Sequence, residues 1–270
     1  MARVWWIGPL VLSAAACSPP GEPAPAVAET AAVTMTPVAS ATPSSRPGPR
    51  GEVDWDSGKG SPSHPNVDPS PVGWYPAAFP ADDSRTVYLT FDDGPSEYTP
   101  QMLRLLRKND ANATFFIVGT QVAGRESVIR DALREGNAIG NHTWDHPDLT
   151  TLRSAQIKDQ LARVAEVAPV GPCMRPPYGA VHEVSGRVAV AMGFQPVMWT
   201  GQAFDWRPTA TASQVEKDIK AATRPGAVIL LHDGGGDRSG TVQAVSRLLP
   251  FWKQQGYAVK SIAACRVSSG

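Results

Sequence analysis

The sequence predicts an α/β domain, a distorted (β/α) barrel of about seven strands, preceded by a disordered N-terminal tether. Beyond residue 85, short β-favouring apolar runs alternate with helical segments, which is the pattern of parallel βαβ units. The 26 prolines crowd the N-terminal third, which indicates a tail followed by a domain. Polar residues follow several of the expected strands, and strand ends converge on one mouth in a barrel. An open doubly wound sheet is the alternative.

The first 17 residues are typical of an export signal. Arg3 supplies a positive charge, residues 4–12 are an apolar run too short to span a bilayer, and small residues precede Cys17. The stretch resembles a lipoprotein signal, in which Cys17 is acylated, although Ala14 stands where that pattern usually has Leu. A plain secretory signal is the alternative. We expect a cell-envelope lipoprotein, or otherwise a secreted protein.

Residues 18–72 consist mainly of Pro, Ala, Thr, Ser and Gly and are expected to form a disordered linker. Such a segment cannot bury enough apolar surface to offset the entropy of ordering. The packed domain is expected to span residues 73–270. The formal net charge of the chain is zero, which argues against a nucleic-acid binder. We expect a monomer that meets the membrane only through a lipid anchor.

The elements of the domain follow from apolar periodicity and from start and stop signals. Pro100 marks a helix start, Gly136 and Gly193 mark helix ends, and Ser213 with Glu216 forms a capping box. The expected strands are 87–91, 114–118, 138–140, 173–175, 196–199, 228–231 and 257–262. The expected helices begin at 100 and 213 or lie near 122–134, 157–164, 183–192 and 241–255.

The stretch from Thr90 to Pro95 ends the first expected strand and contains two adjacent carboxylates, Asp92 and Asp93. Like charges raise each other's pKa unless a cation lies between them. Successive side chains of an extended backbone point in different directions, so one aspartate can bind a metal while the other handles a proton. An Asx-rich turn is the alternative for this stretch taken alone.

His142 and His146 follow the third expected strand, and they lie on one face if that segment is helical. With Asp93 they make a set of two histidines and one carboxylate. Zinc hydrolases and non-haem iron oxygenases both use such a set. Arg175 and His232 stand at the ends of two further strands, and the groups beside the ligands form an acid/base pair, which favours hydrolysis.

The chain has three cysteines. If Cys17 is lipidated, Cys173 and Cys265 can pair in an oxidising compartment. Two buried thiols are the alternative. The triplet Gly234–Gly236 lacks the rest of a phosphate-binding motif and is interpreted as a flexible turn near the mouth.

Five motifs, taken together and in this order, resemble the polysaccharide deacetylases of carbohydrate esterase family four, the NodB homology domain. The resemblance covers about residues 85–265. The motifs are Thr90–Pro95, His142–His146, Arg175–Gly179, Asp205–Trp206 and Leu230–Asp233. Gln202 departs from the family, because many relatives carry an acidic residue at that position of the fourth motif.

The resemblance implies a role for each motif residue. Asp92 is the general base and Arg175 orients it. One divalent metal ion, zinc, is held by Asp93, His142 and His146.

The remaining roles implied by the resemblance concern the proton donor and the acetyl group. His232 is the general acid, and Asp205 tunes it. The backbone N–H of Tyr178 contributes to an oxyanion hole. Trp206 and Leu230 shape the pocket for the acetyl methyl group.

The function implied is metal-dependent removal of N-acetyl groups from an extracellular glycan. Peptidoglycan, at its GlcNAc or MurNAc residues, is the expected substrate because the tether would hold the domain at the envelope. One alternative is an O-acetyl esterase that acts on acetylxylan. Another is a catalytically silent glycan-binding module, whose mark would be a missing base or ligand, and none is missing.

Overall fold

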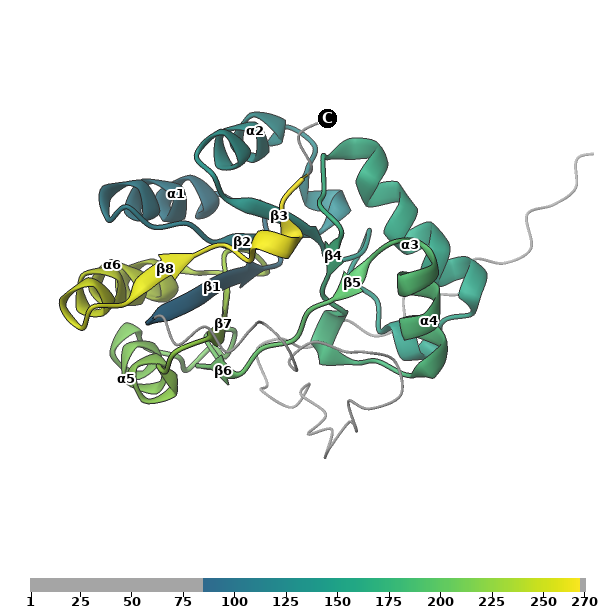
Figure 1. Cartoon of the computed structure of the whole chain (residues 1–270). Coiled ribbons are helices and arrows are strands. Elements are labelled where there is room, and N and C mark those ends of the chain that lie inside the picture. Colours follow the sequence, from purple (N-terminus) through teal and green to yellow (C-terminus); the bar gives the residue numbers. More distant parts are fainter. Residues whose placement is uncertain (1–84, 268–270) are drawn as a thin grey trace, which may run out of the picture. The chain divides into compact units, whose positions relative to one another are not determined.

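The computed structural model describes residues 85–267 and shows a distorted (β/α) barrel of parallel strands surrounded by helices (Figure 1). The predicted signal peptide, the linker, Cys17 and the expected domain start at residue 73 lie outside the described residues. Within that part of the chain the strands are β1 (Thr86–Asp92), β2 (Thr114–Ile117), β3 (Ala138–Asn141), β4 (Cys173–Met174), β5 (Gln195–Pro196), β6 (Gly201–Gln202), β7 (Ala227–His232) and β8 (Ala258–Lys260).

Six α-helices connect these strands and cover the sheet in the part of the chain that the structure describes. They are α1 (Thr99–Lys108), α2 (Glu126–Arg134), α3 (Ser154–Val167), α4 (Glu183–Ala191), α5 (Ala212–Ala222) and α6 (Ser239–Gln254). Short 3₁₀ turns include η3 (Pro177–Gly179) and η4 (Ala263–Cys265). Helix α5 begins at Ala212, because Thr211 caps it by accepting from the Gln214 N–H; the predicted Ser213 cap is therefore wrong.

The strand order is β5-β4-β3-β2-β1-β7-β6, and β8 pairs with the beginning of β1. All ladders are parallel, and β1 lies at the centre between β2 and β7. Residues 197–200 lead from β5 to β6 across the gap between the two ends of this order. All seven predicted strands are present. The sequence missed β6, because Gly201-Gln202 carries no β-favouring apolar side chain.

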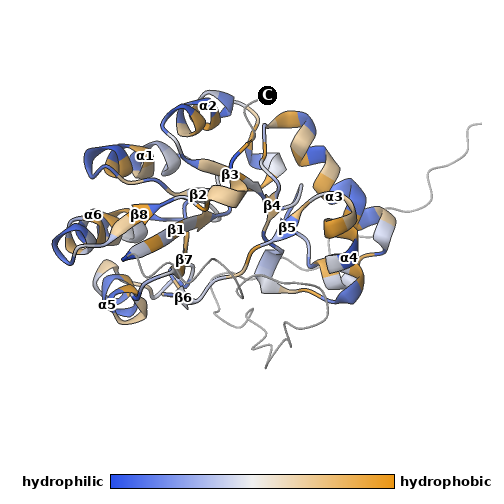
Figure 2. Ribbon diagram, in the orientation of Figure 1, coloured by the Kyte–Doolittle hydropathy of each residue, from blue (hydrophilic) through white to orange (hydrophobic). Residues whose placement is uncertain are grey.

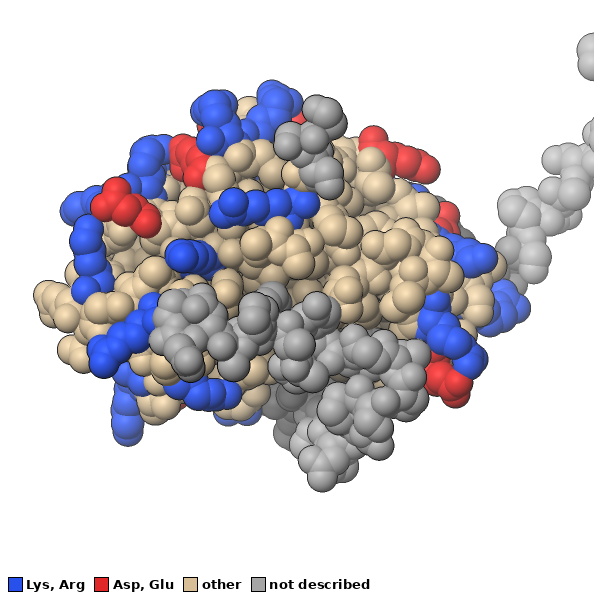
Figure 3. Space-filling model, in the orientation of Figure 1, with Lys and Arg blue, Asp and Glu red and all other residues tan. Residues whose placement is uncertain are grey.

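The core lies between the sheet and the helices that cover it. Val87, Leu89 and Phe91 of β1 are all 0% exposed, and Phe91 stacks on Phe115 of β2 with ring centroids 5.1 Å apart. Figure 2 shows apolar and hydrophilic residues on different faces of the helices, and the apolar faces of α3 and α4 pack against one another. In Figure 3 the Lys, Arg, Asp and Glu side chains lie mainly around the edge of the face shown, and most of the central part is uncharged. No helix among residues 85–267 is long and apolar enough to cross a membrane.

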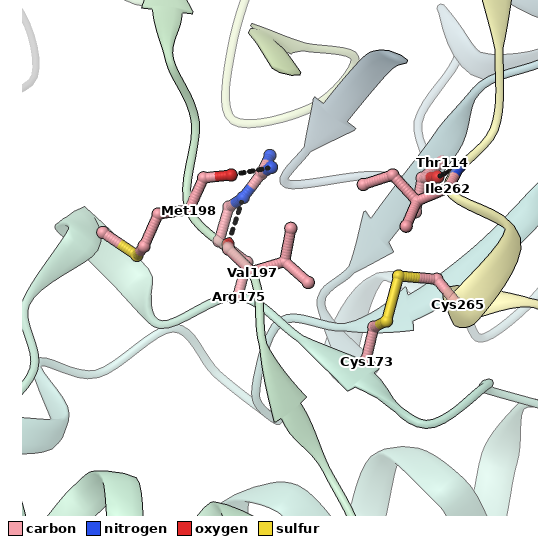
Figure 4. The surroundings of a disulfide bond; sticks show 7 residues. All are labelled: Thr114, Cys173, Arg175, Val197, Met198, Ile262 and Cys265. Carbon is pink, nitrogen blue, oxygen red and sulfur yellow. Dashed lines mark hydrogen bonds between the residues drawn. A yellow bond between two sulfur atoms is a disulfide. The ribbon is translucent and has the colours of Figure 1, made fainter. Parts of the chain in front are cut away.

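Cys173 in β4 and Cys265 in η4 form a buried disulfide, with their Cα atoms 5.0 Å apart (Figure 4). The bond closes a loop with a sequence separation of 92 residues. It ties the C-terminal segment to the strand that precedes Arg175. Because the strands are parallel, the C-terminal ends of β1, β3, β4 and β7 lie at one mouth of the barrel.

Candidate active site

Asp92 and Asp93 are neighbours in sequence but face different partners. Asp92, the last residue of β1, is 3% exposed and accepts a hydrogen bond of 2.8 Å from Nη1 of Arg175. Asp93 leaves the strand with φ of 71°, so its carboxylate turns toward two histidines. Its Oδ1 lies 3.4 Å from Nε2 of His142 and 3.2 Å from Nε2 of His146.

The segment that carries the two histidines is a compact turn, which corrects the helix considered from the sequence. Thr143 and His146 both have positive φ, of 71° and 62°. The turn is held by side chains: Asn141 accepts from the Thr143 N–H, and Thr143 Oγ1 accepts from the His146 N–H. The rings of His142 and His146 consequently meet edge to face, with centroids 4.9 Å apart.

The three side chains fit a divalent metal ion. Their ligand atoms all lie within 4.8 Å of one another. Nδ1 of His142 lies 2.7 Å from the carbonyl oxygen of Arg175, and because a carbonyl only accepts, Nδ1 must carry the proton. When Nε2 carries no proton, the ring presents a lone pair toward Asp93, whose Oδ1 is buried without a hydrogen bond. Two acceptors that face each other require a cation between them, and a hydrogen-bonded outer nitrogen is typical of metal-ligating histidines.

The pKa values of the cluster follow from burial and from mutual charge. Burial opposes the charge on Asp93, but His146 and His142 hold its pKa well below the usual range. Burial lowers the pKa of His146 to about 4, so this ring is neutral near pH 7. For His142 the carboxylates Asp92 and Asp93 outweigh the effect of burial and raise its pKa. The same negative field favours a metal cation at this position.

His232 ends β7 on the other side of Asp92, its register partner in the sheet. Nδ1 of His232 lies 2.8 Å from Oδ1 of Asp205, and the His232 N–H donates to Oδ2 of Asp205. Oδ2 also accepts from the hydroxyl of Thr241 at 2.8 Å. Burial lowers the pKa of His232, but the Asp205 carboxylate outweighs burial and raises it to about 8. The imidazolium form therefore dominates at neutral pH.

Arg175 is fully buried and fixed by several contacts. Besides Asp92 it donates to Oγ1 of Thr90 at 2.7 Å and to the carbonyl of Val197 at 3.0 Å; Figure 4 shows the latter bond. Its guanidinium also lies over the ring of Phe116, 4.2 Å from the centroid. These contacts leave the guanidinium one orientation, toward Asp92.

Three further predicted residues lie near these groups. Tyr178 is 36% exposed, with its ring 4.7 Å from the His146 ring. The ring of Trp206 lies 5.1 Å from that of His232. Leu230 is buried in β7, two residues before His232. All the predicted site residues among 85–267, apart from the two disulfide cysteines, thus line or support one mouth.

The structure adds supporting residues that sequence reasoning missed. Thr90 could have been found, because it lies two residues before Asp92 and so on the same face of the strand. Thr241 and Arg238 gave no local signal, because a loop brings them to Asp205. The glycine turn after β7, expected to be flexible, packs against Asp93.

A parallel barrel that brings a three-ligand cluster, an Arg-held carboxylate and an Asp-held histidine to one mouth has the arrangement of a hydrolase. The family model described as polysaccharide deacetylase matches residues 80–197. A peptidoglycan-N-acetylglucosamine deacetylase of Bacillus cereus is 34% identical over 200 residues, covering 72% of this chain and 93% of the relative.

Two further comparisons agree. A chitooligosaccharide deacetylase of a Bradyrhizobium species is 36% identical over 196 residues, covering 65% of this chain and 88% of that one. The crystal structure of a peptidoglycan N-acetylglucosamine deacetylase superposes with a TM-score of 0.64 at 30% identity, covering 69% of this chain and 90% of that chain. The chain belongs to the polysaccharide deacetylase family, as the five motifs predicted, and it is an enzyme of the hydrolase class.

Proposed function

We propose that the protein is a metal-dependent hydrolase that removes N-acetyl groups from an extracellular glycan, with peptidoglycan as its substrate. One observation carries the chemistry: Asp92 is paired with Arg175, whereas its neighbour Asp93 faces His142 and His146. The two carboxylates therefore have separate tasks, the first as a base and the second as a ligand.

The metal would be held by Asp93, His142 and His146, and zinc suits a set of two histidines and one carboxylate. When bound, such an ion supplies Lewis-acid polarisation of the acetamide carbonyl and of the attacking water. The neutral form of His146 and the Nδ1–H tautomer of His142 support this assignment, because both leave a nitrogen lone pair for a ligand bond.

Asp92 takes the proton of the attacking water. Arg175 holds one carboxylate oxygen, Oδ1, and so orients the carboxylate for this task. A positioned general base contributes about 10²–10⁴-fold to the rate. The N–H of Tyr178 donates to the oxyanion as the carbonyl becomes tetrahedral, and a donor of this kind contributes about 3 kcal/mol.

His232 gives its proton to the departing amine nitrogen. An amine leaves poorly unless it is protonated, so the donor must carry its proton at working pH. The Asp205 carboxylate provides for this by raising the pKa of His232 to about 8. The products are acetate and a free amine on the sugar. Trp206 and Leu230 bound the space for the acetyl methyl group beside this acid.

Peptidoglycan is proposed as the substrate on two grounds. Similar proteins carry the names peptidoglycan-N-acetylglucosamine deacetylase and chitooligosaccharide deacetylase. The export signal and tether predicted for residues 1–72 would place the domain in the envelope. Acetate release from peptidoglycan, chitooligosaccharides and acetylated xylan should be measured side by side. We expect release from peptidoglycan, abolished by chelation and restored by Zn²⁺. Release from xylan alone, or activity after exhaustive chelation, would overturn the proposal.

The envelope location is a proposal of its own, based on acylation of Cys17. Cys17→Ser should move the protein from the membrane fraction to the soluble fraction or block its processing. The soluble-fraction content and the N-terminal mass of wild type provide the reference. A wild-type protein that is already soluble and begins at another residue would instead indicate plain secretion.

A further inference from the structure

The turn between β7 and α6, residues 233–238, lies against the proposed ligand Asp93. A Cβ atom added to Gly234 would come within 2.0 Å of the Asp93 carbonyl oxygen. At Gly235, whose φ is 72°, a Cβ atom would lie 2.6 Å from Oδ2 of Asp93. Only glycine permits both this approach and this backbone conformation. The turn therefore forms one wall of the space that the Asp93 carboxylate occupies.

Arg238 holds this turn in place. Its side chain is buried, with the residue 5% exposed, and Nε donates to the Gly234 carbonyl at 2.7 Å while Nη2 donates to the Gly235 carbonyl at 2.8 Å. Nη1 donates to the carbonyls of Asp205 and Asp237, both at 3.2 Å. All four of these hydrogen bonds have a backbone carbonyl oxygen as the acceptor.

A buried guanidinium usually faces a carboxylate, because burying a charge is costly unless it is paired. Here burial opposes the charge on Asp205, but His232 and the guanidinium lower the pKa of that carboxylate. The planar fork of guanidinium donors fixes carbonyls from two loops in one arrangement. One loop contacts Asp93 on the ligand side, and the other carries Asp205 on the acid side. Arg238 therefore contacts both the turn beside Asp93 and the loop that carries Asp205.

Asp233 anchors the other end of the same turn. Its N–H donates to the Asp92 carbonyl at 3.1 Å, and its Oδ2 accepts from the hydroxyl of Thr99 at 2.5 Å. Its carbonyl accepts from the hydroxyl of Ser96. These bonds tie the turn to the start of α1 and to the segment that follows Asp93.

We propose that Arg238 is a positioning residue: it presses the Gly234–Gly235 turn against Asp93 and so sets the metal site relative to Asp205. This inference rests on the proposed function. It implies that a change at the turn alters metal affinity without removing any ligand. Changes to residues that support metal ligands typically cost about 10- to 100-fold in metal affinity or activity.

The test compares Zn²⁺ affinity and kcat in four full-length proteins: wild type, Arg238→Lys, Gly235→Ala and Gly226→Ala. Gly226 is the matched control, because its φ is 74°, close to that of Gly235, but an added Cβ would meet nothing within 4 Å. Both alanine variants place a Cβ atom at a similar positive φ and so carry similar backbone strain. Only the added Cβ of Gly235→Ala would contact Asp93. Thermal melts record the shared loss of stability.

We expect Gly235→Ala to bind Zn²⁺ about 10- to 100-fold more weakly than Gly226→Ala at similar Tm. Arg238→Lys should weaken Zn²⁺ binding and lower kcat at saturating Zn²⁺, because a lysine cannot span the four backbone carbonyls. If Arg238→Lys does not fold, the two alanine variants decide. Equal Zn²⁺ affinity in the two alanine variants, or a folded Arg238→Lys that keeps the Zn²⁺ affinity and kcat of wild type, would overturn the inference. Wild type that binds no Zn²⁺ would instead overturn the proposed function.

Discussion

His142 and His232 lie at the same mouth, yet their outer ring nitrogens have different partners. Nδ1 of His142 donates to a neutral carbonyl, that of Arg175, whereas Nδ1 of His232 faces the carboxylate of Asp205. A neutral acceptor fixes the tautomer and leaves Nε2 with a lone pair for a ligand bond. A charged acceptor stabilises the imidazolium and keeps a proton for transfer. At this mouth the ligand histidine has a neutral partner on its outer nitrogen and the acid histidine has a charged one.

The largest effect is expected on the ligand side. Asp93→Asn should weaken Zn²⁺ binding and abolish nearly all activity, because it removes the charge that faces His142 and His146. Asp92→Asn should keep the metal and lower kcat by about 10²–10⁴-fold through loss of the base. Metal titration with kcat at saturating Zn²⁺ separates the two. Equal loss of metal in both variants would show that the carboxylates share one task.

On the acid side, Asp205→Asn replaces the charged partner of His232 with a neutral one, so that both histidines have a neutral partner on the outer nitrogen. Without the carboxylate, burial dominates and the pKa of His232 falls below its raised value of about 8. The upper limb of the kcat profile should move to lower pH, with a greater loss at pH 8 than at pH 6. Zn²⁺ affinity should change little. An unmoved limb would mean that His232 is not the group that titrates.

In the wild type, kcat should fall as pH rises through about 8, where His232 loses its proton. The sign for stability follows from the same shift. The folded pKa exceeds the ordinary histidine value of 6.5, so this contribution is fully present below pH 6.5 and is lost as pH rises through about 8. Denaturant titrations at pH 6 and pH 9 measure it. A free energy of unfolding that is higher at pH 9 than at pH 6 would contradict the assignment.

The smallest effect on chemistry is expected from the disulfide, which lies on the ligand side only. Cys173 is two residues before Arg175, whose carbonyl orients His142. Cys173→Ser with Cys265→Ser should lower the free energy of unfolding by up to about 4.6 kcal/mol, judged from the length of the loop. Zn²⁺ affinity should fall while the pKa of His232 stays at about 8. A shifted pKa of His232 with unchanged Zn²⁺ affinity would show that the disulfide supports the acid and not the metal ligands.

The sequence could predict the strands and the residues at their ends, because β-favouring runs and polar termini are local features. It could not predict how His142 and His146 meet, since that depends on positive φ at Thr143 and His146 and on side-chain hydrogen bonds. Arg238 escaped for a similar reason: its acceptors lie on two loops. The packing of the glycine turn against Asp93 could not be predicted, because close packing and flexibility both favour glycine.

The most direct test of the account is imidazole ¹⁵N NMR of the Zn²⁺-loaded protein as a function of pH. It reports both the tautomer and the pKa of each of the five histidines. We predict that His142 stays neutral with its proton on Nδ1 from pH 6 to 8, while the Asp205 carboxylate keeps the pKa of His232 above 6.5. A proton on Nε2 of His142, or a His232 that titrates below 6.5, would contradict the claim that the outer-nitrogen partner selects ligand or acid.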